Sequence, residues 1–484
     1  MTALNKPLVM DIDDTFLRTD MLFECLWGGL GSDPLATIRA VAKHWRDPAT
    51  LKPILADIAQ IDVELLPVNP DLKKLADENI AAGRRVILAS ASDKRLVDDL
   101  AASHGLDAET FGTADGHNLK GKAKAAALVE SFGEGGFDYA GDSRADMAVW
   151  PHADSAIVVG HAHGAAAALA RAGKNVTTIP GGWQFSDLLR AIRPHQWVKN
   201  VLLFLPMLAA QDFTLGTLLA VLMGIVAFSF AASSIYIVND LLDLEADRLH
   251  ATKYKRPFAS GKVPIVVGMI TYALLTATSV IISLILGWQF LVVILVYMVL
   301  SLAYSLRWKR MRWIDIATLA SLYTVRVVAG AAAGSVFVSG FMLVFIFPIF
   351  ITLGCVKRLT ELTLAVSNER LPGRGYSRSD RGDLLNMAWL GGIGALVTFF
   401  LYTLSDQART LYPIQWVLWL AMVPIALWLL RMIRLGYFGK QDYDPIVFAL
   451  RDKRGVGLLL IILSLMFYAA GLWQDWFGFE LSVR

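Results

Sequence analysis

Cysteine is scarce in this sequence, whose 484 residues include only two, Cys25 and Cys355. They lie far apart and match no metal-ligand spacing, so neither a disulfide framework nor a cysteine metal site is expected. The net charge of +3 is also small, which gives no electrostatic basis for nucleic acid binding. The first residues, MTALNKPLVMDIDDT, lack the basic segment, apolar stretch and cleavage site of a signal peptide. We therefore expect the N-terminal part to stay in the cytoplasm.

Long apolar runs are absent before Trp197, although 55% of the sequence is hydrophobic. This shift predicts a mixed α/β domain over residues 1–185 and an all-α membrane domain over residues 186–484. Nine segments of the second domain are candidate spans, namely 195–211, 214–238, 263–285, 288–306, 314–334, 338–357, 386–405, 413–433 and 455–474.

Basic residues alternate between the connections of these spans. The connections after spans two, four, six and eight hold about 21 Lys and Arg, and the others with the C-terminal tail hold only Arg409 and Arg484. Because basic loops stay inside, this pattern predicts a bacterial cytoplasmic-membrane protein with a cytoplasmic N-terminal domain and an outside C-terminus.

Carboxylates gather where the second span ends, in the stretch SIYIVNDLLDLEADRLHATKYKRPFASG. Asn239, Asp243 and Asp247 have the helical spacing i, i+4 and i+8 and should share one face, with Asp240 beside them. Stacked like charges repel unless a cation binds, and oxygen ligands suit Mg²⁺. The alternative is a solvated acidic helix end, but ionisable groups at membrane depth are costly and usually functional.

Basic side chains accompany these acids and could hold phosphate oxygens. The candidates are Lys253, Lys255 and Arg256, which follow the motif. Each is also explained by topology, because positive residues are needed in a cytoplasmic loop. Tyr304 and Asp315 flank the loop after the fourth span, and Arg326 lies about three turns deeper. An arginine inside an apolar helix predicts a polar cavity or an acidic partner.

The pattern NDxxDxxxD at Asn239–Asp247, followed by KxxRP at Lys253–Pro257, resembles the first acidic motif of the UbiA superfamily of intramembrane prenyltransferases. The second motif of that family is usually DxxxD, and here Asp315 is followed by Leu319. The stretches RPHQWVKN, YSLRWK and DYDPIVFALRD are similar to the branch that makes decaprenylphosphoryl-5-phosphoribose.

This resemblance implies that phosphoribosyl pyrophosphate is the donor and a polyprenyl phosphate the acceptor, with Mg²⁺ as cofactor. The metal and pyrophosphate would be held by Asn239, Asp240, Asp243, Asp247 and Asp315. Phosphate oxygens would be bound by Lys253, Arg256 and Lys309, and the lipid phosphate by Lys199, which also fits an interfacial anchor at headgroup depth. The 5-phosphate would be bound by Lys357, Arg358, Arg374, Arg378 and Arg381, which are equally explained as topology determinants. Tyr304, Arg326, Lys357 and Arg358 complete the implied substrate-binding set.

Acids also follow apolar strands in the N-terminal domain. The run PLVMDIDDT places Asp11 and Asp13 at a strand tip, where open α/β sheets bind ligands. VILASAS with Ser90, GKAKAAAL with Lys124, and GDSRAD with Asp142 and Asp146 follow in order. The alternative is that these are ordinary surface acids in turns. The presence of all four pieces in this order makes that alternative improbable.

This order resembles the haloacid dehalogenase-like phosphatases, which implies a Rossmann-like domain with a small helical cap over about residues 17–82. Asp11 would be the nucleophile, Asp13 the general acid, and Ser90 and Lys124 the phosphoryl contacts, with Lys122 an alternative to Lys124. Mg²⁺ would be held by Asp11, Asp142 and the Asp13 carbonyl, with support from Asp146.

We expect a phosphoribosyltransferase in the membrane bilayer, fused to a phosphatase that removes the 5-phosphate of its product, with homo-oligomerisation possible. Two alternatives stay open. One is a conventional prenyltransferase acting on an aromatic acceptor, which the acidic motif supports and Leu319 disfavours. The other is a membrane-anchored phosphatase with non-catalytic spans, which leaves the intramembrane acids and Arg326 unexplained.

Overall fold

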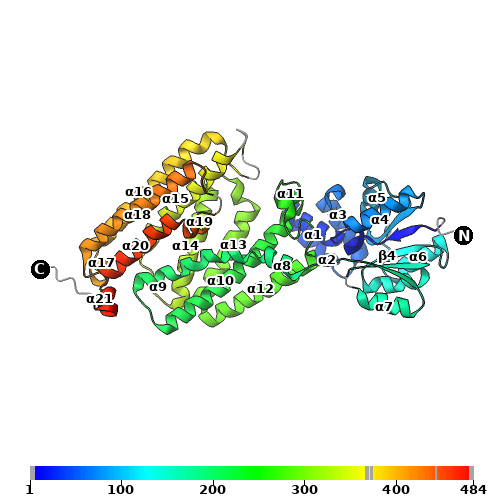
Figure 1. The fold of residues 1–484 in the computed structure, drawn as a ribbon, viewed down its shortest axis with the longest axis horizontal. Coiled ribbons are helices and arrows are strands. Elements are labelled where there is room, and N and C mark those ends of the chain that lie inside the picture. Colours follow the sequence, from blue (N-terminus) through cyan, green and yellow to red (C-terminus); the bar gives the residue numbers. More distant parts are fainter. Residues whose placement is uncertain are drawn as a thin grey trace. The chain divides into compact units, whose positions relative to one another are not determined.

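The computed structural model describes residues 6–114, 116–160, 162–365, 370, 374–441 and 444–478 (Figure 1). The chain forms two compact units. Unit 1 comprises Met1–Ile192 and Tyr236–Ala273, and unit 2 comprises Arg193–Ile235 and Leu274–Arg484. A loop region of the membrane domain therefore belongs to the same unit as the N-terminal domain.

A six-stranded parallel sheet organises unit 1, in the order β3-β2-β1-β4-β5-β6. The strands are β1 (Leu8–Met10), β2 (Val86–Asp93), β3 (Phe111–Thr113), β4 (Asp138–Gly141), β5 (Ser155–Val159) and β6 (Asn175–Ile179). The chain changes direction across the sheet between β1 and β4, and such switch points carry the ligand crevice of open α/β sheets. The α/β architecture predicted for this part is confirmed.

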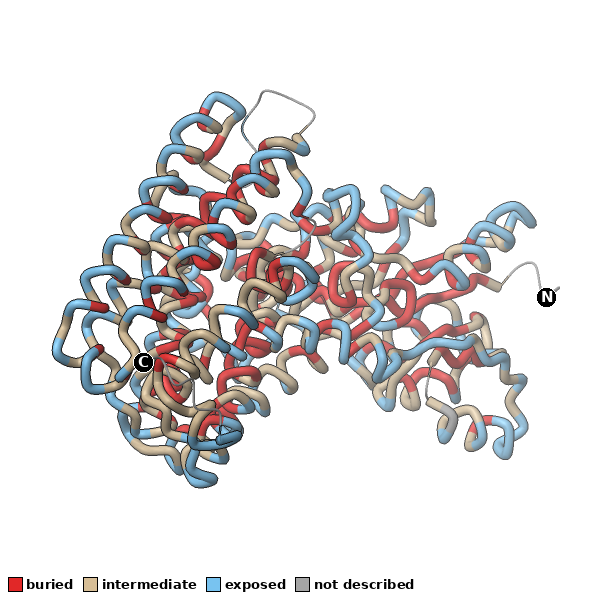
Figure 2. The backbone as a smooth tube through the Cα atoms, turned by 60° about the vertical axis from the view of Figure 1, so that its left-hand side comes forward, coloured by how far each residue is buried: buried red, intermediate tan, exposed pale blue. Residues whose placement is uncertain are grey.

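Helices cover both faces of this sheet, because its strands are apolar on both sides. On one face, α4 (Pro70–Ala81) and α5 (Lys94–Ser103) contribute Leu72 and Leu100 to the core. On the other face, α6 (Lys122–Phe132) and α7 (His163–Arg171) pack with the strands around Trp150. Strands β1, β2, β4 and β5 are mostly buried, whereas the edge strand β6 is mostly exposed. Figure 2 colours the buried residues red.

A helical insert follows β1 and consists of α1 (Met21–Ser32), α2 (Pro34–His44) and α3 (Pro48–Ala59). Asp20, Asp33 and Asp47 cap the starts of these helices by accepting backbone hydrogen bonds. The insert has its own small core, which includes Cys25 and Leu55. Of the predicted cap, residues 70–81 form α4, which packs on the sheet instead.

The remaining elements of unit 1 are short, apart from two long helices that continue into unit 2. Around the sheet lie η2 (Ile12–Phe16), η3 (Val63–Leu65), η4 (Arg144–Ala148), η5 (Trp150–His152) and α8 (Phe185–Ile192). The membrane-domain segment contains the end of α10 (Leu215–Leu242), then α11 (Leu244–Arg248), η7 (Lys253–Lys255) and the start of α12 (Ile265–Leu286).

Unit 2 is all helical. Its further elements are η6 (Pro194–Phe204), α9 (Leu205–Ala210), α13 (Trp288–Leu306), η8 (Trp308–Arg310), α14 (Ile314–Gly334), α15 (Gly340–Leu364), η9 (Arg378–Asp380), α16 (Arg381–Thr403), α17 (Asp406–Leu411), α18 (Gln415–Tyr437), α19 (Pro445–Arg451), α20 (Lys453–Ala469) and α21 (Leu472–Phe477). Helix α14 is the most enclosed long helix, and Gly330 lets η6 approach it. A Cβ at Gly330 would lie 2.0 Å from the Leu203 carbonyl oxygen.

Seven described helices are long and apolar enough to cross a membrane, namely α10, α12, α13, α14, α15, α16 with its preceding turn, and α18. The first predicted span forms η6 and α9 instead. Eleven 3₁₀ residues at about 2.0 Å and six α-helical residues at about 1.5 Å per residue reach about 31 Å, enough for the hydrocarbon core. The last span is the 17-residue α20, so the count of nine stays a prediction.

Candidate functional site

Three carboxylates converge at the carboxyl ends of β1 and β4. One oxygen each of Asp11, Asp142 and Asp146 lies within 4.8 Å of the others. Asp11 follows β1 and Asp142 follows the neighbouring β4, so parallel pairing brings the two tips together. At Gly141 a Cβ would lie 2.7 Å from Asp146 Cγ, so glycine permits this approach. This donor set, composed only of oxygens, fits Mg²⁺.

Hydrogen bonds orient two of these acids. Asp146 accepts from the Tyr139 hydroxyl at 2.7 Å and, through its other oxygen, from the Ser143 backbone and hydroxyl. Asp11 Oδ1 accepts from the Ile12 backbone and from Lys124 Nζ, each at 2.8 Å. Both of these bonds use Oδ1, so Asp11 Oδ2 is the oxygen available to a metal or to phosphorus.

Electrostatic crowding raises the pKa of these acids. Burial raises the pKa of Asp11 to about 7, with Asp146 and Asp13 adding to the shift and Lys124 opposing it. Burial and the neighbouring carboxylates raise the pKa of Asp142 to about 8. Burial lowers the pKa of Lys124, but Asp11 and Asp146 outweigh this and hold the pKa above its ordinary value. One lysine does not neutralise three acids, and a divalent cation would complete the balance.

Lys124 lies in the site, whereas Lys122, the alternative left open by the sequence, is exposed. Lys124 also contacts the Tyr139 hydroxyl at 3.0 Å. It occupies the third position of α6, whose start after Gly121 turns this side chain toward the sheet.

Asp13 is held differently from the arrangement expected. The backbone leaves helical geometry at Asp13 and Asp14, with a positive φ of 55° at Asp14. Asp13 Oδ2 then accepts from the hydroxyls of Ser90 and Ser92, both at 2.9 Å, and Oδ1 accepts from the Met21 backbone. Ser90, which was predicted to contact phosphate, is fully buried and donates to Asp13; the phosphate contact stays a prediction. Ser92 lies two residues further along β2, and the sequence analysis did not predict its contact with Asp13.

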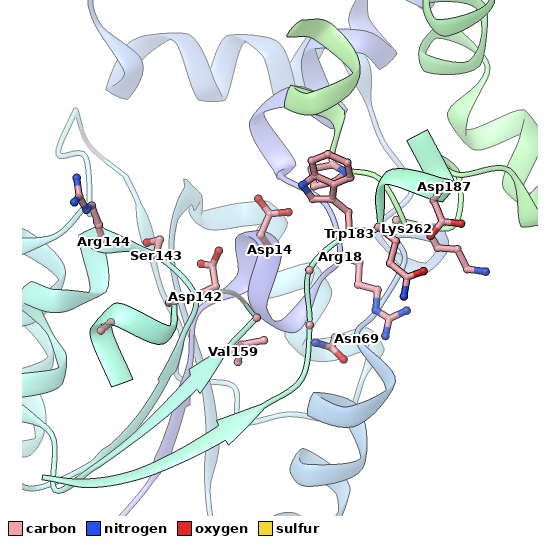
Figure 3. Close-up of a pocket in the computed structure, with 18 of the residues that line it drawn as sticks. Asp14, Arg18, Asn69, Asp142, Ser143, Arg144, Val159, Trp183, Asp187 and Lys262 are labelled. Carbon is pink, nitrogen blue, oxygen red and sulfur yellow. The ribbon is translucent and has the colours of Figure 1, made fainter. Parts of the chain in front are cut away.

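A pocket of about 1000 Å³ opens beside these acids within unit 1 (Figure 3). Asp14 and Asp142 line it, together with Arg18, Asn69 and Trp183. Gly261, Lys262 and Pro264, from the segment that follows the acidic motif, form another part of its wall.

The acidic motif does not form the continuous helical face that its spacing predicts. Helix α10 ends at Leu242, Asp243 leaves helical geometry with φ −103° and ψ 17°, and α11 begins at Leu244. Asp240 and Asp247 still converge, because Arg256 Nη1 lies 3.0 Å from Asp240 Oδ1 and 2.6 Å from Asp247 Oδ2. Both acids are buried.

The other predicted residues of this segment lie nearby in sequence. Asn239 is half-buried at the end of α10, and Lys253 is exposed in η7. Among the described residues, the only trio of acids, histidines or cysteines with metal-binding spacing is that of Asp11, Asp142 and Asp146. Asp240 and Asp247 meet on the guanidinium of Arg256.

Asp315 forms a buried ion pair in unit 2. Arg358 donates to it through two nitrogens, Nε at 2.5 Å and Nη2 at 2.7 Å, and both side chains are fully buried. The Tyr304 hydroxyl donates to Asp315 at 2.9 Å, and Arg374 Nη1 lies 3.7 Å away. Arg358 also contacts Glu361. Asp315 was predicted to bind metal and Arg358 substrate; the two side chains pair with each other in the structure, and both roles stay predictions. Leu319, one turn further, is buried.

A second cluster in unit 2 surrounds Asp444, which the sequence analysis did not single out. Lys199 Nζ lies 3.0 Å and Lys357 Nζ 3.3 Å from Asp444 Oδ2, and the Tyr323 hydroxyl donates to both of its oxygens. Lys199 is buried. Asp444 lies within the quoted stretch DYDPIVFALRD, so a signal was present; Asp442 and Tyr443 of that stretch fall outside the described residues.

Arg326 has aromatic rather than acidic neighbours. Its guanidinium carbon lies 5.1–5.7 Å from the ring centroids of Phe228, Tyr297 and Tyr323. It donates to Asn200 Oδ1 and to the Leu322 carbonyl. Cation–π contacts of this kind stabilise a buried charge. Of the two expected surroundings, a polar cavity or an acidic partner, the contacts of the described residues show polar and aromatic groups and no acid. Lys309 lies half-buried in η8.

Known proteins share this membrane domain. Residues 201–361 match the UbiA prenyltransferase family. An uncharacterized protein, y4nM, of Sinorhizobium fredii is 34% identical over 455 residues, 92% of this chain and 88% of that protein. Nodulation protein NoeC of Azorhizobium caulinodans is 32% identical over 58% of this chain and 94% of its own length. Decaprenyl-phosphate phosphoribosyltransferase of Mycobacterium tuberculosis is 33% identical over 58% of this chain and 93% of its own length.

The similarity covers nearly the whole length of these relatives, and the seven apolar helices agree with it. The chain therefore belongs to the UbiA prenyltransferase family and is a multi-pass membrane transferase.

Proposed function

We propose that the membrane domain transfers a 5-phosphoribosyl group from phosphoribosyl pyrophosphate to a polyprenyl phosphate, and that the N-terminal domain then removes the 5-phosphate. The observation that carries this proposal is the similarity to a decaprenyl-phosphate phosphoribosyltransferase along 93% of that protein. The topology proposed with it keeps the N-terminal domain cytoplasmic and the C-terminus outside, in a bacterial cytoplasmic membrane.

The pyrophosphate of the donor would be held at the acidic motif. Asp240 and Asp247 already direct oxygens at one cationic nitrogen, that of Arg256, which marks a position suited to a cation. When bound, Mg²⁺ would neutralise the departing pyrophosphate. Asn239 and Asp243 supply further oxygens, and Arg256, once displaced, would join Lys253 and Lys309 on phosphate oxygens.

The acceptor phosphate would bind at the Asp444 cluster. Lys199 and Lys357 share one carboxylate, so the cluster has an excess of one positive charge inside the helical unit. A monophosphate would satisfy that excess. A phosphate oxygen of the lipid attacks C1 of the ribose, the bond from C1 to the pyrophosphate oxygen breaks, and pyrophosphate leaves. The products are polyprenyl-phosphoryl ribose 5-phosphate and pyrophosphate.

The second acidic motif is proposed to act as a support. Asp315 positions Arg358, while Arg374 and Tyr304 lie at the less buried side of the pair and can reach substrate phosphate. The buried Leu319 offers no second carboxylate, which favours this reading over conventional prenyl transfer.

The N-terminal site has the groups for hydrolysis of a phosphomonoester. Asp11 Oδ2 attacks phosphorus, the bond from phosphorus to the sugar oxygen breaks, and Asp13 donates a proton to that oxygen. Water then attacks the aspartyl-phosphate, releasing phosphate and regenerating Asp11. Lys124 holds Asp11 and neutralises charge, and Ser90 with Ser92 orients Asp13. Asp11, Asp142 and the Asp13 carbonyl would hold Mg²⁺, supported by Asp146.

The test supplies membranes containing the full chain with labelled phosphoribosyl pyrophosphate and polyprenyl phosphate. Wild type should form labelled polyprenyl-phosphoryl ribose and free phosphate. Asp243→Asn should abolish the lipid product yet keep hydrolysis of generic phosphate esters, and the nearby exposed Glu245→Gln serves as its matched control. Asp11→Asn should accumulate the 5-phosphorylated lipid. Label incorporation from a prenyl diphosphate into an aromatic acceptor, with none from phosphoribosyl pyrophosphate, would refute the proposal.

A further inference from the structure

The pocket beside Asp14 and Asp142 is lined in part by a segment from the membrane domain. Lys262 lies in the connection between the second and third predicted spans, yet it faces the same pocket as Arg18, which follows β1. In Figure 3, Arg18, Trp183 and Lys262 lie to the right of Asp14 and Asp142. Arg18 and Lys262 therefore lie in another part of the pocket than Asp14 and Asp142, whereas Arg144 lies on the side of Asp142 and Asp187 on the side of Lys262.

We propose that Arg18 and Lys262 determine the specificity of the phosphatase by binding a second phosphate, the one attached at C1 of the ribose. This inference rests on the proposed function. The substrate class is a pentose that carries a phosphomonoester at one end and a phosphodiester at the other. The phosphomonoester lies at Asp11, and the second anion lies at the two cations.

The position of Lys262 is fixed by close backbone packing. Gly261 has a positive φ of 66°, and a Cβ there would lie 2.6 Å from both Cβ and the carbonyl oxygen of Arg18. Only glycine permits this approach without displacing the chain. The Lys262 and Val263 backbone amides both donate to the Pro257 carbonyl. The loop therefore holds its lysine beside Arg18.

A second anchor ties the same loop to the helical insert. Arg248 Nε donates to the Ala259 carbonyl at 3.0 Å, and its other nitrogens bind Glu24 in α1. Phe258 and Val263 are buried on either side of the lysine-bearing turn. Such anchoring is what a binding residue requires, because a preformed site loses less conformational entropy when it binds ligand.

The charges of these two cations are available to a ligand. Two further basic residues line the pocket: Arg190 is paired with Asp187 at 2.9 Å, and Arg144 lies on the side of Asp142. In the described part of the chain, neither Arg18 nor Lys262 has a carboxylate within ion-pair distance. Arg18 is half-buried, so an anion there is partly shielded from water and bound more strongly than at an open surface.

The shape of the pocket agrees with a sugar that bears two phosphates. Its volume of about 1000 Å³ exceeds the need of a single phosphate and lies at the upper end of ordinary ligand pockets. Trp183 adds a flat apolar surface between the polar groups, suited to packing against a sugar ring.

The test compares three substrates with the full chain in detergent: ribose 5-phosphate, ribose 1,5-bisphosphate, and a short-chain polyprenyl-phosphoryl ribose 5-phosphate. For Arg18→Gln and Lys262→Gln, the kcat/KM of each two-phosphate substrate relative to ribose 5-phosphate should fall about tenfold or more, mainly through KM. Arg190→Gln, in the same pocket, is the matched control and should keep the wild-type ratio. Thermal unfolding confirms that each variant is folded.

Three outcomes would overturn the inference. If the kcat/KM ratio of the two-phosphate substrates to ribose 5-phosphate is unchanged in both variants, the two cations do not bind the second phosphate. A fall for the lipid substrate alone would assign them to the polyprenyl chain instead of the anion. Wild type that hydrolyses ribose 5-phosphate but never the lipid substrate would refute the proposed function itself, which is a separate result from an unchanged ratio.

Discussion

Arg248 and Glu24 form a buried ion pair that joins two segments 224 residues apart, with Nη2–Oε1 at 2.5 Å and Nη1–Oε2 at 3.1 Å. The Thr19 hydroxyl donates to the same carboxylate at 2.6 Å. Glu24 lies in the helical insert, and Arg248 closes α11 directly after the acidic motif. The pair therefore connects the helical insert, which follows Asp11 and Asp13, with the segment that follows the acidic motif.

Removal of one partner of this pair should destabilise unit 1. Glu24→Leu leaves the Arg248 guanidinium buried without its carboxylate, at a cost of about 3–5 kcal/mol. Thermal unfolding of the purified full chain measures the loss. The double variant Glu24→Leu with Arg248→Met should recover much of it, and a double variant no more stable than Glu24→Leu would contradict this account.

Magnesium should stabilise the N-terminal site more strongly as pH rises. Ordinary carboxyl groups titrate near pH 4, whereas the pKa of Asp11 is about 7 and that of Asp142 about 8. Their protonated forms therefore contribute stability that is complete below about pH 4 and is lost as pH rises through 7 to 8. Metal binding requires the ionised acids and relieves their repulsion.

The increase in melting temperature on adding Mg²⁺ should accordingly grow between pH 5 and pH 8. Differential scanning fluorimetry of the full chain measures it, and Asp142→Asn should remove the pH-dependent part. A Mg²⁺ effect of equal size at both pH values would count against a metal at these three acids.

The two membrane-side acids, Asp247 and Asp315, should respond differently to magnesium. Asp315 is neutralised by Arg358, so Asp315→Asn should lower activity and stability without changing the Mg²⁺ concentration that gives half-maximal transfer. Asp247→Asn should raise that concentration about tenfold or more. Titration of transferase activity with Mg²⁺ makes the comparison, and a large shift for Asp315→Asn would restore it as a metal ligand.

The Asp444 cluster allows a comparison of two neutralising changes. Asp444→Asn leaves Lys199 and Lys357 together without their carboxylate, which should cost about 3–5 kcal/mol. Lys199→Met leaves Asp444 with Lys357 and Tyr323 and should destabilise less, while raising KM for polyprenyl phosphate. Melting temperatures of the two purified variants test the order, and the reverse order would be inconsistent with the observed contacts.

Much of the N-terminal site follows from the sequence because strand tips are local features. Asp11 and Asp142 each follow a short apolar run, and parallel pairing of those strands brings the tips together. Asp146 follows Asp142 by four residues and turns back over Gly141. The roles of Ser92 and Tyr139 are harder to predict, since their hydroxyls reach the acids only through the three-dimensional packing of β2 and β4.

The membrane-side prediction was less accurate in geometry. Helical spacing placed Asn239, Asp243 and Asp247 on one face, but spacing alone does not reveal that α10 ends before Asp243. The neighbours of Arg326 come from separate helices, and nothing local in the sequence pairs an arginine with Phe228 or Tyr297. The 3₁₀ geometry of η6 likewise has no compositional signal, because it depends on the packing of η6 against α14.

The glycine turn at residue 261 has a consequence for gene architecture. A truncated protein ending near residue 192 would retain every group that reacts with phosphate but would lose Lys262 and the partner of Glu24. Such a fragment would keep Arg18 but lack Lys262, one of the two cations proposed to bind the second phosphate of the substrate. Splitting the gene near residue 192 would therefore separate the catalytic residues of the phosphatase from a residue that determines its specificity. Exchange of either half between distant homologues would require matched changes at the residues that contact each other across this boundary.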